Sequence, residues 1–131
     1  GQAMLQAITI RDQRFEEAKR DMDFIKRYIF PGGFLPSHHA MLSGVMRKTS
    51  LNVVALDEIG QHYARTLREW RHRFEASLDQ VRSQGYDERF IRMWRYYLCY
   101  CEGGFIERSI GTCHLLLAKP AAKPVPLTGA L

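Results

Sequence analysis

Hydrophobic and polar residues alternate along this chain in a pattern that predicts three strands separated by helices. Each strand is rich in β-branched and apolar residues and is bounded by charged or turn-forming residues. The third strand has a continuous apolar centre, which favours burial on both faces of a sheet. The expected strands cover residues 4–10, 51–56 and 111–119.

Apolar residues spaced three and four apart predict four helices between these strands. The last two helices are long and amphipathic. The third also carries Arg65–Glu69 and Arg71–Glu75 pairs, whose four-residue spacing allows ion pairs along one helix. The glycine pair at 103–104 should weaken the fourth helix by about 1 kcal/mol per glycine relative to alanine, unless something packs closely there. The expected helices cover residues 12–30, 38–48, 61–82 and 87–108.

Turn and cap residues mark the helix boundaries. The Pro-Gly-Gly run at 31–33 ends the first helix, and Ser37 is the expected N-cap of the second. The resulting order is strand, two helices, strand, two helices, strand. This is an α/β pattern with too few strands to close a sheet comfortably. The first strand would expose an unpaired edge, which favours aggregation or strand-swapped dimers.

The composition narrows the class of protein. The length of 131 residues allows one domain, and 46% hydrophobic with 25% charged residues is an ordinary globular composition. The net charge of +5 permits an anionic partner but demands none. No apolar run approaches the roughly 20 residues of a membrane span, and the N-terminus lacks a signal-peptide pattern. Three cysteines without metal-binding spacing suit reduced thiols, so we expect a cytoplasmic protein.

Several motifs that carry chemistry are missing from the sequence. Neither G-x-G nor G-x-S-x-G occurs, so the sequence has no dinucleotide fingerprint, P-loop or hydrolase elbow. His38 and His39 cannot both reach one metal from a regular helix, and we expect no metal site. Arginines interleaved with aromatic residues over 89–95 resemble a nucleic-acid surface, but interspersed acids favour a solvated helix face. We therefore expect no nucleic-acid partner.

Three segments together carry a family resemblance. They are residues 24–37 (FIKRYIFPGGFLPS), 62–74 (HYARTLREWRHRF) and 86–98 (YDERFIRMWRYYL), the last followed by 101–105 (CEGGF). Together these segments resemble the C-terminal portion of cyclopropane-fatty-acyl-phospholipid synthases and of the related mycolic-acid cyclopropane synthases. The resemblance covers nearly the whole chain, from Met4 to Pro120.

The resemblance implies an S-adenosylmethionine-dependent methyltransferase with a Rossmann-like class I sheet, of which this chain would supply about three strands. Such enzymes methylate the cis double bond of an unsaturated acyl chain on a phospholipid. The resulting carbocation loses a proton to a bound bicarbonate, and a cyclopropane ring closes. The cofactor loop of the family lies in its N-terminal half, so we expect S-adenosylmethionine to bind mainly outside this chain. Residues 1–120 would be the C-terminal substrate-side portion, and residues 121–131 a flexible tail.

The resemblance also implies catalytic roles for three positions. Tyr63 matches the tyrosine in the family's Y-x-R-T-L run, which helps to hold the bicarbonate, although its place in the apolar stripe equally fits packing. Aligning the first strand places Gln6 where many members have a histidine, and Ile8 where a backbone group contacts the same anion. A glutamine still donates through its amide. The departure at Gln6 leaves open a true cyclopropane synthase or a sister methyltransferase.

The apolar, bendable segment that contains the Pro-Gly-Gly run fits a lipid tail better than a polar metabolite. Arg65, Arg68 and Arg71 either face the anionic headgroups of a membrane surface or form a solvated helix face. We expect a cytoplasmic protein, peripheral to the membrane, that works as a homodimer or with an N-terminal cofactor-binding half. The alternative is a lipid-surface or protein-interaction module without catalytic activity. The wall expected to touch the acyl chain consists of Phe24, Ile25, Tyr28, Ile29, Phe30 and Phe34.

Overall fold

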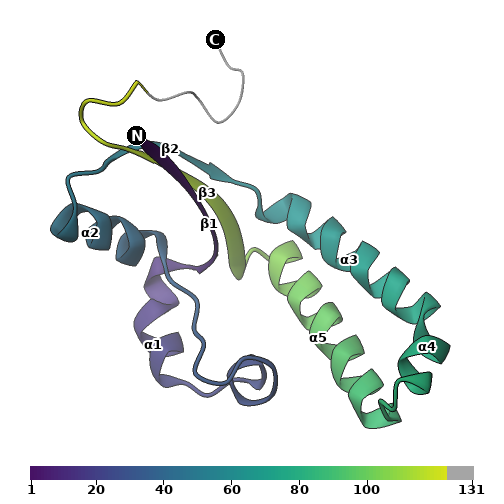
Figure 1. Ribbon diagram of the computed structural model, residues 1–131. Coiled ribbons are helices and arrows are strands. Elements are labelled where there is room, and N and C mark those ends of the chain that lie inside the picture. The colour runs from purple at the N-terminus through teal and green to yellow at the C-terminus, as the bar shows by residue number, and fades with distance from the viewer. Residues whose placement is uncertain (124–131) are drawn as a thin grey trace. The chain divides into compact units, whose positions relative to one another are not determined.

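The computed structural model describes residues 1–123, which form two compact units (Figure 1). The first unit contains residues 1–60 and the chain from Ile110 onwards, and the second contains residues 61–109. Most of the tail expected over 121–131 lies outside the described residues.

The first unit is built on a three-stranded antiparallel sheet, counted over residues 1–123. Its strands are β1 (Gln2–Ile10), β2 (Asn52–Glu58) and β3 (Ile110–Ala118), in the order β1-β3-β2. The mixed α/β class is therefore confirmed. The central position of β3 also confirms the predicted burial on both faces, because Cys113 and Leu115 are fully buried there and Leu116 is 2% exposed.

Strand register sets which side chains share a face of the sheet, because directly opposite residues of paired strands point the same way. Gln6 of β1 and Asp57 of β2 both pair with His114 of β3. Ile8 of β1 pairs with Thr112, the next residue of β3 on that face. β2 therefore extends through the acidic residues that were expected to end it.

The segment predicted as one helix over 12–30 is three short pieces. They are a 3₁₀ turn (Asp12–Arg14), α1 (Phe15–Arg20) and a π-helical turn (Ile25–Ile29). The prediction of a single helix was wrong because local side-chain bonds compete with the helix. Lys26 Nζ donates to the carbonyls of Ala18 and Asp21 at the end of α1, and Asp23 Oδ1 accepts the Lys26 N–H at 2.9 Å.

Helix α2 (His38–Lys48) begins where the sequence predicted. The Ser37 hydroxyl oxygen accepts the backbone N–H of Ala40 at 3.2 Å, which confirms Ser37 as the N-cap. Asp12 Oδ1 accepts the backbone N–H of His39 at 2.8 Å. Hydrogen bonds from Ser37 and from that N–H hold the pKa of Asp12 below its ordinary value. The 3₁₀ turn and α2 are therefore tied together.

The second unit consists of the three helices α3 (Gly60–Ala76), α4 (Leu78–Ser83) and α5 (Glu88–Ile106). The first residue of α3, Gly60, still belongs to the first unit. The single helix expected over 61–82 breaks at Ser77, whose hydroxyl donates to the carbonyl of Arg73. Helices α3 and α5 lie side by side (Figure 1). Their buried apolar side chains are Ala64, Leu67, Ile91, Leu98 and Phe105. Among the described residues, no helix combines the length and apolar character needed to cross a membrane.

Candidate functional site

Gln6 and Ile8 lie on β1 and face the central strand. Gln6 is exposed, and its side-chain Oε1 lies 2.9 Å from Nε2 of His114. The partly buried His114 belongs to the apolar run of β3, and it was not predicted as a site residue. Its signal in the sequence is that a titratable residue interrupts an otherwise apolar strand. The structure thus brings a histidine to Gln6 from the neighbouring strand.

Two further polar side chains share this face of the sheet. Asp57 pairs with His114 from the opposite side, so the row across the sheet reads Gln6, His114, Asp57. Thr112 is fully buried, and its hydroxyl Oγ1 has no hydrogen-bond partner among the described residues. An unpartnered buried hydroxyl costs free energy. Gln6 and Asp57 are the exposed members of this row and His114 is partly buried, whereas the Thr112 hydroxyl lies beneath the surface.

Tyr63 lies on α3, in the second unit, and it is partly buried against aromatic rings. Its ring centroid is 5.1 Å from that of Phe105 and 6.0 Å from that of Trp70. The packing expected for Tyr63 is therefore present, and its role at an anion stays a prediction. Tyr63 belongs to a different unit from Gln6 and Ile8.

Tyr97 and Cys101 form a second polar group in the same unit. Burial, with smaller effects from Cys101 and Tyr63, raises the pKa of Tyr97 to about 12. Burial likewise raises the pKa of Cys101 to about 11, against a hydrogen bond with Tyr97 that lowers it. Both groups are therefore protonated near neutral pH, and the Cys101 thiol is a poor nucleophile.

Two arginines of α3 pair with one carboxylate of α5. Glu102 Oε1 accepts from Arg68 Nε at 2.7 Å, and Glu102 Oε2 accepts from Arg71 at 3.1 Å. Burial alone would raise the pKa of Glu102, but the hydrogen bonds from Arg68 and Arg71 outweigh it and hold the pKa below its ordinary value. Two of the three arginines expected at headgroups thus already have a carboxylate partner.

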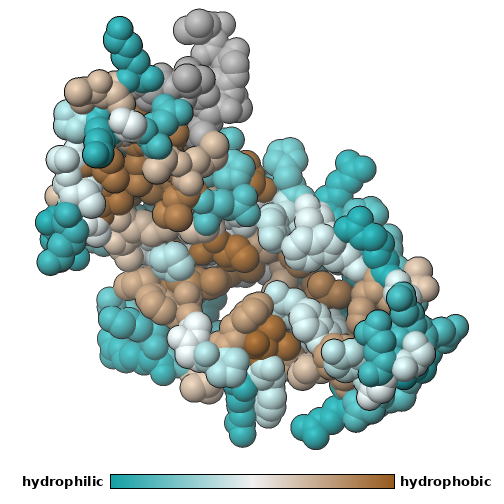
Figure 2. Space-filling model, in the orientation of Figure 1, coloured by the Kyte–Doolittle hydropathy of each residue, from teal (hydrophilic) through white to brown (hydrophobic). Residues whose placement is uncertain are grey.

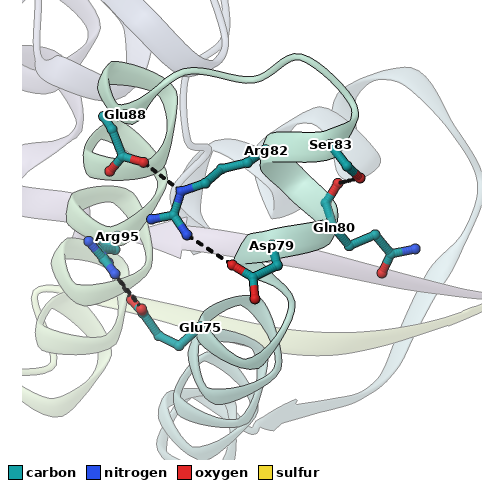
Figure 3. Close-up of polar contacts among 7 residues, drawn as sticks. All are labelled: Glu75, Asp79, Gln80, Arg82, Ser83, Glu88 and Arg95. Atoms are coloured by element: carbon teal, nitrogen blue, oxygen red, sulfur yellow. Dashed lines mark hydrogen bonds and ion pairs between the residues drawn. The ribbon is translucent and has the colours of Figure 1, made fainter.

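A second set of ion pairs lies toward the other end of these helices (Figure 3). Glu75 accepts two hydrogen bonds of 2.6 Å from Arg95 of α5. Hydrogen bonding to Arg95 holds the pKa of Glu75 below its ordinary value. Arg82 donates to Glu88 at 2.7 Å and to Asp79 at 3.3 Å. These ion pairs of Glu102, Glu75 and Glu88 each join two different helices, whereas the sequence pattern predicted pairs within one helix.

The six residues expected to line an acyl chain form an apolar segment of the first unit. Phe24, Ile25 and Ile29 are partly buried, whereas Tyr28, Phe30 and Phe34 are 50%, 56% and 49% exposed. Figure 2 shows apolar residues reaching the surface of the face it draws. The structure therefore leaves half of the expected wall accessible to a ligand.

A cavity of about 550 Å³ opens in the first unit, on α1 and α2. It holds none of the predicted site residues. Its apolar lining comes from Phe15, Ala40 and Met46, and its polar lining comes from Glu16, Lys19, His39, Ser43 and Arg47.

The sequence has no G-x-G turn, and we assign none of the described residues to S-adenosylmethionine. No group of three or more His, Cys, Asp or Glu residues within 1–123 is placed to hold a metal ion. The Gln6 amide is an exposed hydrogen-bond donor on the sheet face that also carries His114 and Asp57.

Comparisons with known proteins agree on one family. The family model for mycolic acid cyclopropane synthetase matches residues 1–115. The chain is 42% identical over 105 residues to a tuberculostearic acid methyltransferase of Mycobacterium tuberculosis, covering 80% of this chain and 25% of that protein. It is 37% identical over 89 residues to the cyclopropane-fatty-acyl-phospholipid synthase of Escherichia coli K12, covering 66% of this chain and 22% of the synthase.

Solved structures show the same fold. The mycolic acid cyclopropane synthase CmaA1, complexed with SAH and CTAB, matches with a TM-score of 0.78 and 25% identity over 91% of this chain and 44% of that one. The cyclopropane synthase MmaA2 from Mycobacterium tuberculosis matches with a TM-score of 0.77 at 23% identity, which supports the fold alone. The chain spans about a quarter of the length of the curated relatives named above. On the match over residues 1–115, the chain belongs to the mycolic acid cyclopropane synthetase family.

Proposed function

We propose that this chain is the substrate-side part of an S-adenosylmethionine-dependent methyltransferase that methylenates unsaturated acyl chains of membrane phospholipids. The observation that carries the proposal is the family match over residues 1–115. Relatives with this match are named for lipid methylation or cyclopropanation, including a sphingolipid C9-methyltransferase of Gibberella zeae that is 30% identical over 94 residues. A solved relative complexed with SAH supports S-adenosylmethionine as the methyl donor.

The proposed roles of this chain's residues concern the substrate and a bound anion. In this proposal Tyr28, Phe30 and Phe34 contact the acyl chain, which their solvent exposure of 50%, 56% and 49% supports. Tyr63, Gln6 and the backbone of Ile8 hold a bicarbonate in this proposal. When bound, bicarbonate supplies a base for the proton that leaves the methylated chain. The phenol of Tyr63 and the amide of Gln6 are donors that suit an oxyanion.

A chimera tests the proposal. The chain replaces the segment that it matches in the Escherichia coli synthase, and the chimera is expressed in a strain that lacks its own synthase. We expect mass spectrometry of the phospholipids to show acyl chains that have gained one CH₂. Tyr63→Phe keeps the ring contacts with Phe105 and Trp70, removes only the hydroxyl, and should slow methylene transfer about a hundredfold.

The control is Tyr86→Phe, because Tyr86 is exposed, stacks on Phe90 and is not one of the predicted anion residues. A soluble chimera that adds no CH₂, or one in which Tyr63→Phe transfers methylene as fast as Tyr86→Phe, would count against the proposal.

A second candidate function is a lipid-surface or protein-interaction module without catalysis. The exposed side chains of Met22, Tyr28, Phe30 and Phe34 favour it, because exposed aromatic groups bind at membrane interfaces. Sedimentation with anionic and neutral liposomes separates the two functions. Binding that needs no cofactor, together with a chimera that adds no CH₂, would favour the module. We further propose that the protein works at the membrane periphery, as a homodimer or with a separate cofactor-binding half.

A further inference from the structure

The Gln6–His114 contact fixes the direction in which the Gln6 amide points. The two atoms that meet are the amide Oε1 and the imidazole Nε2, 2.9 Å apart. An amide oxygen only accepts hydrogen bonds, so Nε2 of His114 must carry the proton. The orientation of a glutamine amide is set by such a partner, because its oxygen and nitrogen ends are otherwise interchangeable. With Oε1 held by His114, the two N–H donors of Gln6 point away from the imidazole.

The strand register makes this contact part of the sheet. Gln6 and His114 are directly paired residues of β1 and β3, so their side chains leave the same face close together. β3 is the central strand and His114 is partly buried, which restricts the motion of the imidazole more than that of an exposed side chain. Asp57 of β2 is the charged group that faces His114 from its other side. The imidazole therefore sits between a carboxylate and an amide in one row.

Thr112 adds another polar side chain to this face of the sheet. Thr112 lies two residues before His114 on β3, so it shares the face, and it pairs with Ile8. Its hydroxyl is fully buried and has no hydrogen-bond partner among the described residues. Native proteins seldom leave such a group unsatisfied. The Gln6 amide is exposed on the same face, so it is the donor there that a small oxyanion can reach.

We propose that His114 is a positioning residue that turns the donor end of Gln6 toward a small oxyanion of the bicarbonate class. The inference rests on the proposed function, because it concerns the same anion site. His114 acts through Gln6 in this proposal and does not touch the reacting atoms. It names a role for a residue of the central strand that the family resemblance did not mark.

Nuclear magnetic resonance of the 131-residue chain tests the inference without any activity measurement. Sodium bicarbonate is titrated into the labelled chain, with sodium chloride at equal ionic strength as the reference, and the side-chain N–H signals of Gln6 are followed. We expect a saturable shift with bicarbonate and none with chloride. In His114→Ala the apparent dissociation constant should rise about tenfold, the size expected for one hydrogen bond to a charged group.

Exchange of the two residues distinguishes positioning from simple support of the fold. His114→Gln alone should weaken bicarbonate binding, whereas the double variant Gln6→His, His114→Gln restores a donor on β1 held by a partner on β3. We expect the exchange to return the dissociation constant to within about threefold of the original. A threefold change corresponds to about half the free energy of a net hydrogen bond. His72→Gln, an exposed histidine of α3, is the matched control and should change nothing.

The inference is overturned if bicarbonate fails to shift the Gln6 signals, if chloride shifts them equally, or if binding is unchanged in both His114→Ala and His114→Gln. If His114→Ala does not fold, the bicarbonate dissociation constants of His114→Gln and of the exchanged pair test the inference instead. Failure here is separate from failure of the proposed function. A chimera that adds CH₂ at the same rate with and without His114→Gln removes only this inference, whereas an inactive chimera with intact bicarbonate binding removes only the proposed activity.

Discussion

Two glycines are required by the close packing around the Glu58 carboxylate. Glu58 Oε1 accepts the backbone N–H groups of Gly60 at 3.0 Å and of Thr112 at 2.8 Å. A Cβ added to Gly60 would lie 2.8 Å from Glu58 Oε1 and 3.2 Å from both the Gly111 Cα and the Thr112 nitrogen. A Cβ on Gly111 would lie 2.8 Å from the same carboxylate oxygen. The end of β2 and the start of β3 therefore approach too closely for a side chain.

We predict that Gly60→Ala lowers the free energy of unfolding by about 1–3 kcal/mol, because overpacking forces backbone atoms of β3 apart. Urea unfolding followed by circular dichroism measures the change. Gly103→Ala is the matched control. Nothing lies within 4 Å of a Cβ at Gly103, so no neighbouring residue packs closely against this glycine.

Alanine at 103 should raise the free energy of unfolding by up to about 1 kcal/mol through helix propensity. Equal changes in the two variants would contradict the packing argument.

At the scale of elements, Glu102 joins α3 and α5 through two arginines. Its side chain is 9% exposed, whereas the side chains of Arg68 and Arg71 are 50% and 30% exposed. A carboxylate buried to this degree is stabilised only while it is paired, because its desolvation is costly. The arrangement therefore makes Arg68 and Arg71 structurally necessary as long as Glu102 is present.

We predict that the double variant Arg68→Leu, Arg71→Leu lowers the free energy of unfolding by about 3–5 kcal/mol, since it leaves an unpaired buried charge. Adding Glu102→Leu should recover most of that loss, because the charge itself is removed. Thermal and urea unfolding of the three chains measure the difference. If the triple variant is as unstable as the double variant, the buried charge is not the cause.

Acid provides an independent check on the same carboxylate. Because the pKa of Glu102 is lowered in the folded chain, its stabilisation is present above the ordinary carboxyl pKa of about 4.3. It is lost as the pH falls through the lower folded value, since the unfolded state then binds more protons. Glu102→Gln should therefore show a smaller loss of stability than the original chain between about pH 5 and about pH 2.

Element boundaries show which local signals the sequence carries and which it does not. The cap at Ser37 was predictable, because a hydroxyl before an apolar run satisfies an orphan N–H of the helix. The break after Arg20 was not, because it depends on where the long Lys26 side chain reaches. The pairing of Glu75 with Arg95 was also not predictable, because a four-residue spacing identifies only neighbours on the same helix.

At the scale of the whole chain, strand order explains why the candidate site was only half predictable. The resemblance located Gln6 and Ile8 on β1, but a linear sequence does not state which strand lies next to it. Pairing of β1 with β3 brings together residues 108 positions apart, Gln6 and His114. Contacts of this range require the topology, and no spacing rule supplies it.

The two edges of the sheet differ in how well they resist pairing with another chain. β2 carries a register shift between Val53 and Ala55, and such a bulge bends and twists an edge strand. β1 instead pairs with β3 without a shift over its whole length, and the described residues place no strand on its other side. Its side chains Met4 and Leu5 are 59% and 46% exposed. β1 is therefore the edge open to a second strand.

We predict that the 131-residue chain self-associates as its concentration rises, and that Met4→Lys, Leu5→Lys suppresses this association. Lysines on an edge strand oppose pairing because two copies would bring like charges together. Met46→Lys is the matched control, since Met46 is 75% exposed on α2 in the same unit but lies on no strand. Sedimentation velocity over a range of concentrations measures the outcome. A chain that stays monomeric throughout, or one that Met46→Lys disperses as well as the β1 variant does, would show that the β1 edge does not drive association.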